Sequence, residues 1–363
     1  MMRRLQQLVT ILGMCGLLVL PRQAAFAQTC EPIGAHNLNA IAPYAVLYHD
    51  DPVALAWSPD SQTLAFSARG EIGFYSPTLG ETRRALTFEL RKVGDFEFLP
   101  VASALDFSDD GSMLAFTLGT LNIFDMATTE TRILDDFSDE FLGTGLAVDF
   151  NGDSTHAAVM TGDGVLLLVD IRQARRISQV APTENYVTGN VVLYSRDSGV
   201  LIDAVDSIVT FRNPLTLEAL ASDTPVDQPI RDLALTSNDR ILAGISNNYA
   251  SGRDRAWLTF WDMSTFERLR SVVTYGGSVS LSFSPNDDLM AMGSAANIYL
   301  WDLRSTTVLD IAADEATRVL EEHVGDVESI AFSPDGRFLA SASVDFSNPT
   351  SDEGTIIVWG VCS

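Results

Sequence analysis

Short apolar runs, broken by turn-forming residues, recur along nearly the whole chain. The clearest example is residues 330–359, in which IAF and FLASAS flank a Ser-Pro-Asp-Gly turn and GTIIVW follows a polar loop. Apolar and polar residues alternate with a period of two inside these runs, which is typical of β-strands joined by turns. We therefore predict three strands of one small sheet in this stretch.

The same unit recurs six more times upstream, so the chain contains seven copies. Counted from the residue before the first turn, the copies follow one another at intervals of 42 to 50 residues. These residues are Trp57, Phe107, Phe150, Tyr194, Thr236, Phe283 and Phe332. A unit of this length with four strands is typical of a propeller blade, which buries both sheet faces only by stacking on its neighbours. We predict an all-β, seven-bladed β-propeller of four-stranded antiparallel blades.

A fourth strand is expected after the third strand of each copy. Arginine and glutamate alternate with apolar residues there, as suits an outer, half-exposed strand. The candidates are residues 83–90, 131–136, 175–180, 267–273 and 317–322. The last copy has no such segment, because four residues follow Trp359. The similar segment His36–Ala42 precedes the first copy, so we expect it to complete the last blade and close the ring.

The N-terminus has the composition of an export signal. Two arginines at positions 3 and 4 precede the apolar run Leu8–Leu20, which is too short to span a bilayer comfortably, and Ala25-Phe26-Ala27 fits a cleavage site. We predict a signal peptide over residues 1–27, a single propeller domain over residues 28–363, and a periplasmic or extracellular location. No later run is long and apolar enough for a transmembrane helix, so we expect no membrane insertion after signal removal.

The overall charge narrows the class of partner. The formal net charge is −25, and Lys92 is the single lysine. So acidic a surface repels phosphate backbones and anionic lipids, which argues against nucleic acid as a partner. We expect a monomer.

Two cysteines remain after signal removal, near opposite ends of the mature chain. Cys362 follows the third strand of the last copy, and Cys30 lies six residues before the expected closing strand. Cysteines of exported proteins can pair, and a bridge across almost the whole chain would restrict the unfolded state. We expect a Cys30–Cys362 disulfide that staples the ring; the alternative is two unrelated free thiols.

Several copies share residues at the first turn and at the end of the third strand. The chain has FSPDG at 332–336, SPD at 58–60, FSP at 283–285 and the dipeptide Trp-Asp at 261–262 and 301–302. In these residues it resembles the WD40-repeat β-propeller family, as a divergent, exported, bacterial-type member, over essentially residues 36–362. The resemblance implies a non-catalytic interaction platform that binds a protein or peptide.

The resemblance also implies a structural set of four hydrogen-bonded residues in some blades. The last copy alone could carry it, with His323 before the first strand and Trp359 at the end of the third. The second strand offers Ser341 or Ser343, and the turn that follows offers Asp345 or Asp352. Such a set satisfies buried polar groups and is not a catalytic pair.

The longer loops gather in two classes, those between blades and those between second and third strands. Both classes emerge on one face of an antiparallel propeller, and long loops on a rigid ring are where binding usually resides. Aromatic and basic residues in these loops form the predicted binding face; drift in unconstrained loops is the alternative. They are Lys92, Phe96, Phe98, Tyr249, Arg253, Arg255 and Phe346.

The sequence contains no recognisable catalytic or metal-binding motif. The four histidines are solitary, no nucleophile or phosphate-binding motif is present, and the calcium-like spacing at 149–153 coincides with a first turn. We therefore expect no cofactor, no metal and no catalytic residue. The alternatives are a hydrolase or lyase with its site at the channel mouth, and a structural module of a cell-envelope assembly.

Overall fold

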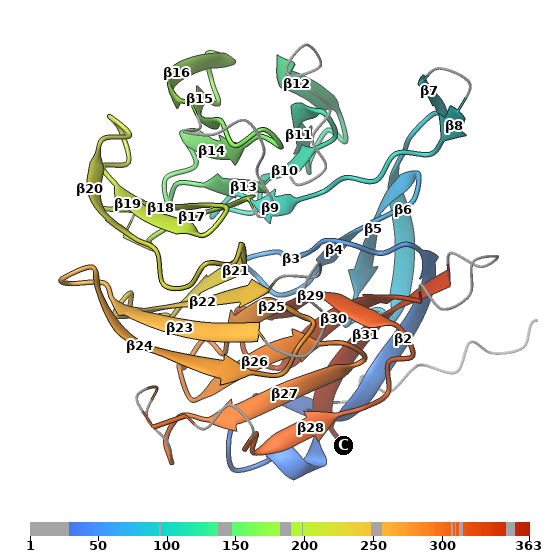
Figure 1. Cartoon of the computed structure of the whole chain (residues 1–363). Helices are drawn as coiled ribbons and strands as arrows, with labels where there is room; N and C mark the ends of the chain where they lie inside the picture. The colour runs from blue at the N-terminus through green and yellow to red at the C-terminus, as the bar shows by residue number, and fades with distance from the viewer. Residues whose placement is uncertain are drawn as a thin grey trace, which may run out of the picture.

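The computed structural model describes residues 29–93, 96–136, 147–181, 190–197, 199–247, 256–305, 308, 310–311, 315–345 and 353–363. Its strands form seven antiparallel sheets arranged as the blades of a ring (Figure 1). Six sheets have four strands each, and the seventh combines three strands from the C-terminus with N-terminal strands. The predicted all-β, seven-bladed propeller is confirmed. Within the described ranges, no helix is long and apolar enough to cross a membrane.

The strands follow one another from the inner to the outer edge of each blade. Blades one to three contain β3 (Leu55–Trp57), β4 (Leu64–Ala68), β5 (Glu71–Ser76) and β6 (Glu81–Thr87); β9 (Leu105–Phe107), β10 (Met113–Thr117), β11 (Thr120–Asp125) and β12 (Thr131–Asp136); and β13 (Ala147–Phe150), β14 (His156–Met160), β15 (Leu166–Asp170) and β16 (Arg175–Val180). Blades four to six contain β17 (Asn190–Tyr194), β18 (Leu201–Val205), β19 (Ile208–Arg212) and β20 (Ala219–Asp223); β21 (Ile230–Leu235), β22 (Ile241–Asn247), β23 (Ala256–Asp262) and β24 (Glu267–Thr274); and β25 (Ser278–Phe283), β26 (Leu289–Ser294), β27 (Asn297–Asp302) and β28 (Arg318–Leu320). Blade seven contains β29 (Asp326–Phe332), β30 (Phe338–Val344) and β31 (Glu353–Cys362).

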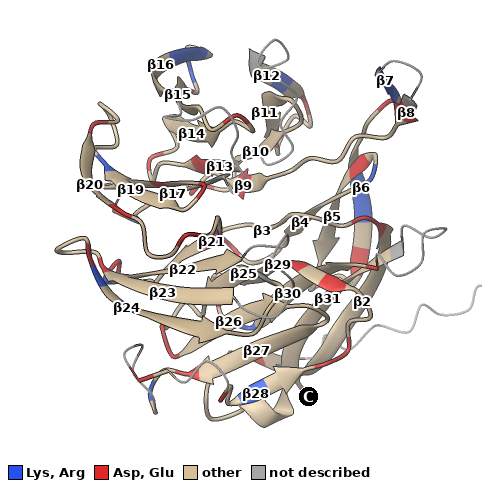
Figure 2. Cartoon of the chain, viewed as in Figure 1, with Lys and Arg blue, Asp and Glu red and all other residues tan. Residues whose placement is uncertain are grey.

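Burial explains this order. The second and third strands are almost continuously buried, because blades stack on both of their faces, whereas the outer strands are half exposed. Basic residues lie on outer strands such as β6 and β16 (Figure 2). The predicted fourth strands at 131–136 and 175–180 coincide with β12 and β16.

The ring closes through N-terminal strands, but not through the strand that we predicted. β2 (Ala42–Asp50) pairs with β31 along its length, and the two lie side by side in Figure 1. The predicted strand His36–Ala42 is wrong: only Ala42 belongs to β2, and the residues before it form a turn and the 3-10 helix η1 (Leu38–Ala40). The reason is packing, because Leu38 and Ile41 are buried in a cluster with residues of blades six and seven.

The disulfide is present as predicted. β1 (Cys30–Glu31) pairs with the end of β31, and in this register Cys30 lies opposite Cys362. The two side chains form a disulfide with Cα atoms 4.0 Å apart across 332 residues of chain. Two N-terminal segments, β1 and β2, thus pair with β31, with η1 between them in sequence.

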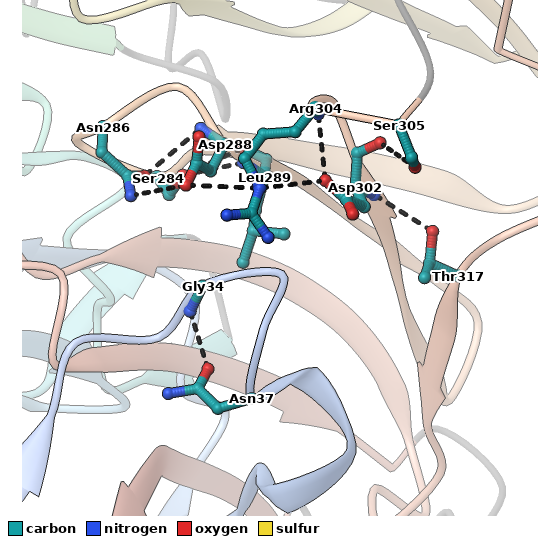
Figure 3. Close-up of polar contacts among 10 residues, drawn as sticks. All are labelled: Gly34, Asn37, Ser284, Asn286, Asp288, Leu289, Asp302, Arg304, Ser305 and Thr317. Atoms are coloured by element: carbon teal, nitrogen blue, oxygen red, sulfur yellow. Dashed lines mark hydrogen bonds and ion pairs between the residues drawn. The ribbon is translucent and has the colours of Figure 1, made fainter.

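Every copy has the same hydrogen bonds at its first turn. A side chain directly after the inner strand bonds to the side chain two residues on and accepts the backbone N–H five residues on; these residues are Ser58, Ser108, Asn151, Ser195, Thr236, Ser284 and Ser333. Figure 3 shows this turn in blade six, with Ser284, Asn286 and Leu289. The inner strand of blade five therefore ends at Leu235, and our alignment on Thr236 was one residue late. In blade three the calcium-like spacing is this turn, since Asn151 bonds to Asp153.

Candidate functional site

A cavity of about 300 Å³ lies at the channel mouth, at the start of the inner strands. The loops between blades precede these strands, so this mouth belongs to the loop-rich face. Blades one to four contribute Ala, Val and Leu residues and Ser103, whereas blades five to seven contribute polar and charged residues and Val279. The polar residues are Arg231, Asp232, Ser280, Glu328 and Ser329. The mouth therefore has an apolar wall facing a charged one, which suits an amphipathic segment.

Two carboxyl groups in the charged wall have unusual acidity. Burial raises the pKa of Asp232 to about 6, although its carboxylate accepts the Leu281 N–H at 2.7 Å and the Ser280 hydroxyl at 3.2 Å. Burial also raises the pKa of Glu328 to about 6; Asp326 adds to this shift and Arg231 opposes it. Near neutral pH the charge of this wall therefore depends on pH.

Asp232 belongs to a series of contacts that join neighbouring inner strands. Asp106 accepts the N–H of Phe150 at 2.7 Å, and Asp149 accepts that of Tyr194 at 2.6 Å. Burial and the neighbouring carboxyl raise the pKa of Asp106 well above its usual value, and burial raises the pKa of Asp149 to about 7. Each of these side chains ties one blade to the next, so their buried position has a structural explanation.

The predicted loop between blades one and two contains a small hairpin. β7 (Arg91–Val93) pairs with β8 (Phe96–Phe98), and the hairpin projects from the ring (Figure 1). Lys92 forms an ion pair with Glu97 at 3.5 Å. The Phe98 side chain is 45% exposed, and Leu90 and Leu99 beside the hairpin are exposed as well. Lys92 and Phe98 are therefore accessible to solvent, and their part in binding stays a prediction.

The other predicted binding residues are not open to the same test. Tyr249, Arg253, Arg255 and Phe346 lie outside the described residues. Phe96 is described by its backbone position in β8 alone. Their part in binding stays a prediction.

In blade seven the predicted structural set brings three residues together. His323 Nε2 lies 2.6 Å from Ser341 Oγ, and the Trp359 indole N–H donates to the same oxygen at 2.8 Å. His323 Nδ1 lies 2.9 Å from the Thr355 hydroxyl. Burial lowers the pKa of His323 to about 4, so the ring is neutral at pH 7. The Nδ1 partner is thus the Thr355 hydroxyl. The aspartate of the set, Asp345 or Asp352, stays a prediction, and Asp352 lies outside the described residues.

Comparison with known proteins identifies the repeat. A family model described as "WD domain, G-beta repeat" matches residues 268–302 and 314–360. Each match begins at the outer strand of one blade and ends with the third strand of the next. The chain carries WD40 repeats. The offset between repeat and blade is why the N-terminus of this WD40 propeller has to complete the last blade.

Two curated proteins share short stretches with the WD40 propeller. "WD repeat-containing protein 36" of Homo sapiens is 44% identical over 75 residues, which is 21% of this chain and 8% of that protein. An uncharacterized WD repeat-containing protein of Schizosaccharomyces pombe is 42% identical over 79 residues, 22% of this chain and 11% of that protein. This chain therefore matches about a tenth of the length of these relatives.

A solved structure matches the whole ring. A chain in "Crystal Structure of Mitotic Checkpoint Complex" superposes with a TM-score of 0.68 at 15% identity, covering 99% of both chains. At this identity the likeness shows the fold alone. Among the described residues, no group of three or more His, Cys, Asp or Glu side chains is placed to hold a metal ion.

Blade four of the WD40 propeller holds a polar pair that sequence reasoning missed. Asp203 and Arg212 form an ion pair inside the blade. Counted from the first turn, Asp203 occupies the position of Ser341 in blade seven, and the strand register puts Arg212 at the position of Trp359. In both blades the third-strand nitrogen donates to the second-strand oxygen. The signal was present in the sequence, because Asp203 interrupts the apolar run of residues 200–205.

Proposed function

We propose that this protein is an exported, monomeric, non-catalytic platform that binds a protein or peptide through the loop-rich face of its propeller. WD40 propellers are typically platforms for protein interaction, and the family match supports that class. The observation that carries the proposal is the channel mouth, where an apolar wall from blades one to four faces Arg231, Asp232 and Glu328. The exposed hairpin with Lys92 and Phe98 extends the same face.

Export is supported by two features. The N-terminal residues 1–27 have the composition of a signal peptide, and the Cys30–Cys362 disulfide is of the kind that persists in oxidising compartments. N-terminal sequencing of the protein from its native cell tests this part. A mature start at Gln28 supports export, and a retained Met1 in a cytosolic fraction contradicts it.

Affinity capture with matched variants tests the binding face. The wild type is compared with Phe98→Ala on the hairpin, Glu328→Gln at the mouth, and Leu215→Ala as a control. Leu215 is 63% exposed in a turn between third and fourth strands, which lies on the opposite face. We expect a stoichiometric partner that the Leu215 variant retains and that the Phe98 or Glu328 variant loses. Equal capture by all four proteins would contradict the proposal.

The enzymatic alternative needs reacting groups at the channel mouth. Asp232 there accepts two hydrogen bonds that tie blades five and six together, which supports a structural role for this carboxyl. A substrate that the captured complex turns over, with loss of turnover in Glu328→Gln, would favour the enzyme instead.

A further inference from the structure

A cleft of about 410 Å³ separates the outer halves of blades three and four. Its upper walls are aliphatic, with Leu166 and Val180 from blade three facing Val205 and Ile208 from blade four. Deeper in the cleft, blade four presents Thr210 and the Asp203–Arg212 pair. The aliphatic residues lie where their strands begin or end on the loop-rich face, whereas Arg212 and Ala219 lie at the strand ends toward the opposite face.

At the floor of the cleft, arginine occupies the position that holds an indole in blades five to seven. In blade seven the equivalent space holds the fully buried Trp359, and blades five and six bury Trp261 and Trp301 at the end of the same strand. Arg212 is slimmer, and its guanidinium turns toward Asp203 and the Leu217 carbonyl. Blade four thus lacks the indole that fills this space in blades five to seven.

The floor of the cleft offers hydrogen bonds without net charge. Asp203 is 1% exposed and accepts from both Nε and Nη2 of Arg212, and Nη1 donates to Leu217. These contacts engage three of the five guanidinium N–H groups. A donor and an acceptor therefore lie side by side, and the Thr210 and Ser222 hydroxyls lie 3.4 Å from each other nearby.

We propose that this cleft is a binding site for a neutral, amide-bearing peptide segment with an adjacent aliphatic side chain. An amide N–H complements the Asp203 carboxylate, and an amide carbonyl complements the free directions of the Arg212 fork. A ligand carboxylate would be attracted by Arg212 but repelled by Asp203, and a ligand ammonium would be attracted by Asp203 but repelled by Arg212. A charged group therefore gains little net electrostatic energy in this cleft. The aliphatic walls take a leucine-like side chain, and the volume suits one or two residues.

This site is separate from the channel mouth and from the β7–β8 hairpin. The proposal does not depend on the function proposed above, because its test uses a small probe and no native partner. A failed affinity capture would leave it untouched.

The probe is N-acetyl-leucyl-glutamine methylamide, titrated into the full ¹⁵N-labelled mature protein. We expect saturable shifts of the Val205, Thr210 and Ser222 amide signals and of Arg212 Nε, with a Kd on the order of 1 mM, as suits a ligand of this size. The matching probes with glutamate or lysine in place of glutamine should bind at least about tenfold more weakly. Wild-type protein that shows no saturable shift, or that binds the charged probes equally well, would overturn the proposal.

Two neighbouring substitutions supply the structural control. Ala219 is exposed and lines the cleft, so Ala219→Trp should fill it and weaken the glutamine probe at least about tenfold. Leu220 is 53% exposed and is not part of the cleft wall, so Leu220→Trp should bind like the wild type. An unchanged thermal melt verifies that both variants fold. Equal binding by the two variants would place the probe elsewhere and refute the site.

Discussion

Cys30 lies directly opposite Cys362 on adjacent antiparallel strands, and the disulfide between them joins the first described strand of the ring to the last. The hydrogen bonds of β1 and β2 to β31 and the disulfide therefore act at the same junction, which we call the seam: the place where the N-terminal strands meet β31 and close the ring. Opening this seam would release the outer edge of blade seven. The stability of the ring should depend strongly on these contacts.

We expect Cys30→Ser/Cys362→Ser to lower the free energy of unfolding by roughly 2–5 kcal/mol, because the bridge closes a very long loop in the unfolded state. Urea unfolding of the wild type and the double variant measures the difference. Reductant should destabilise the wild type but not the double variant, which has no disulfide to reduce and therefore serves as the control. Equal midpoints for the oxidised wild type and the double variant would show that the hydrogen-bonded strands alone hold the seam.

His323 should make the protein sensitive to mild acid. Its pKa is about 4 in the folded state because of burial, below its ordinary value of 6.5, so the unfolded chain binds a proton first as the pH falls. The stability that His323 contributes is complete above about pH 6.5 and is lost as the pH falls toward 4. Between about pH 7 and pH 4.5 the wild type should lose roughly 2 kcal/mol more than His323→Gln. A parallel pH dependence of the two proteins in urea unfolding would contradict this assignment.

Asp232 should give a pH dependence of stability opposite to that of His323. Its folded pKa of about 6 is raised above the ordinary value of 3.8, so the stability linked to its protonation is complete below about pH 4 and is lost as the pH rises through 6. Asp232→Asn keeps an oxygen for the Leu281 N–H and removes the charge, so it should match or exceed the wild type in stability at about pH 8, by at most about 3 kcal/mol. Urea unfolding at this pH makes the comparison. If the Asp232→Asn variant is less stable than the wild type there, the carboxylate is needed in its ionised form.

The architecture was predictable because the same unit of strands and turns recurs seven times in the sequence. The alternation of apolar and polar residues and the first-turn residues locate the second and third strands. One copy with a degenerate pattern does not change the prediction when the other six show it clearly. Ring closure by the N-terminus and the disulfide partner followed from the missing fourth strand. The closing strand itself was misplaced: Leu38 and Ile41 are three residues apart, without the period-two spacing of a strand, and they are buried by packing between blades. Such long-range packing leaves no local pattern.

The candidate sites were less predictable for a related reason. The channel mouth is made of two or three residues from each of the seven blades, so no contiguous motif marks Arg231 or Glu328. Thr236 was misaligned because threonine can either end a strand or begin a turn, and its hydrogen bond to Asn238 decides between them. Asp203 and Arg212 became a pair only once the strand register was known.

Exchanging the polar pair of blade four for that of blade seven tests whether the two are equivalent. Asp203→Ala alone leaves the Arg212 guanidinium buried without its carboxylate and should cost about 3–5 kcal/mol of stability. The double variant Asp203→Ser/Arg212→Trp rebuilds the contact that Ser341 and Trp359 make in blade seven, and the indole fills the cleft between blades three and four. We therefore expect urea unfolding of the double variant to recover most of the loss, with Arg212→Trp alone remaining destabilised because Asp203 then lacks its cation. A double variant no more stable than Asp203→Ala would mean that blade four has diverged too far to accept the pair.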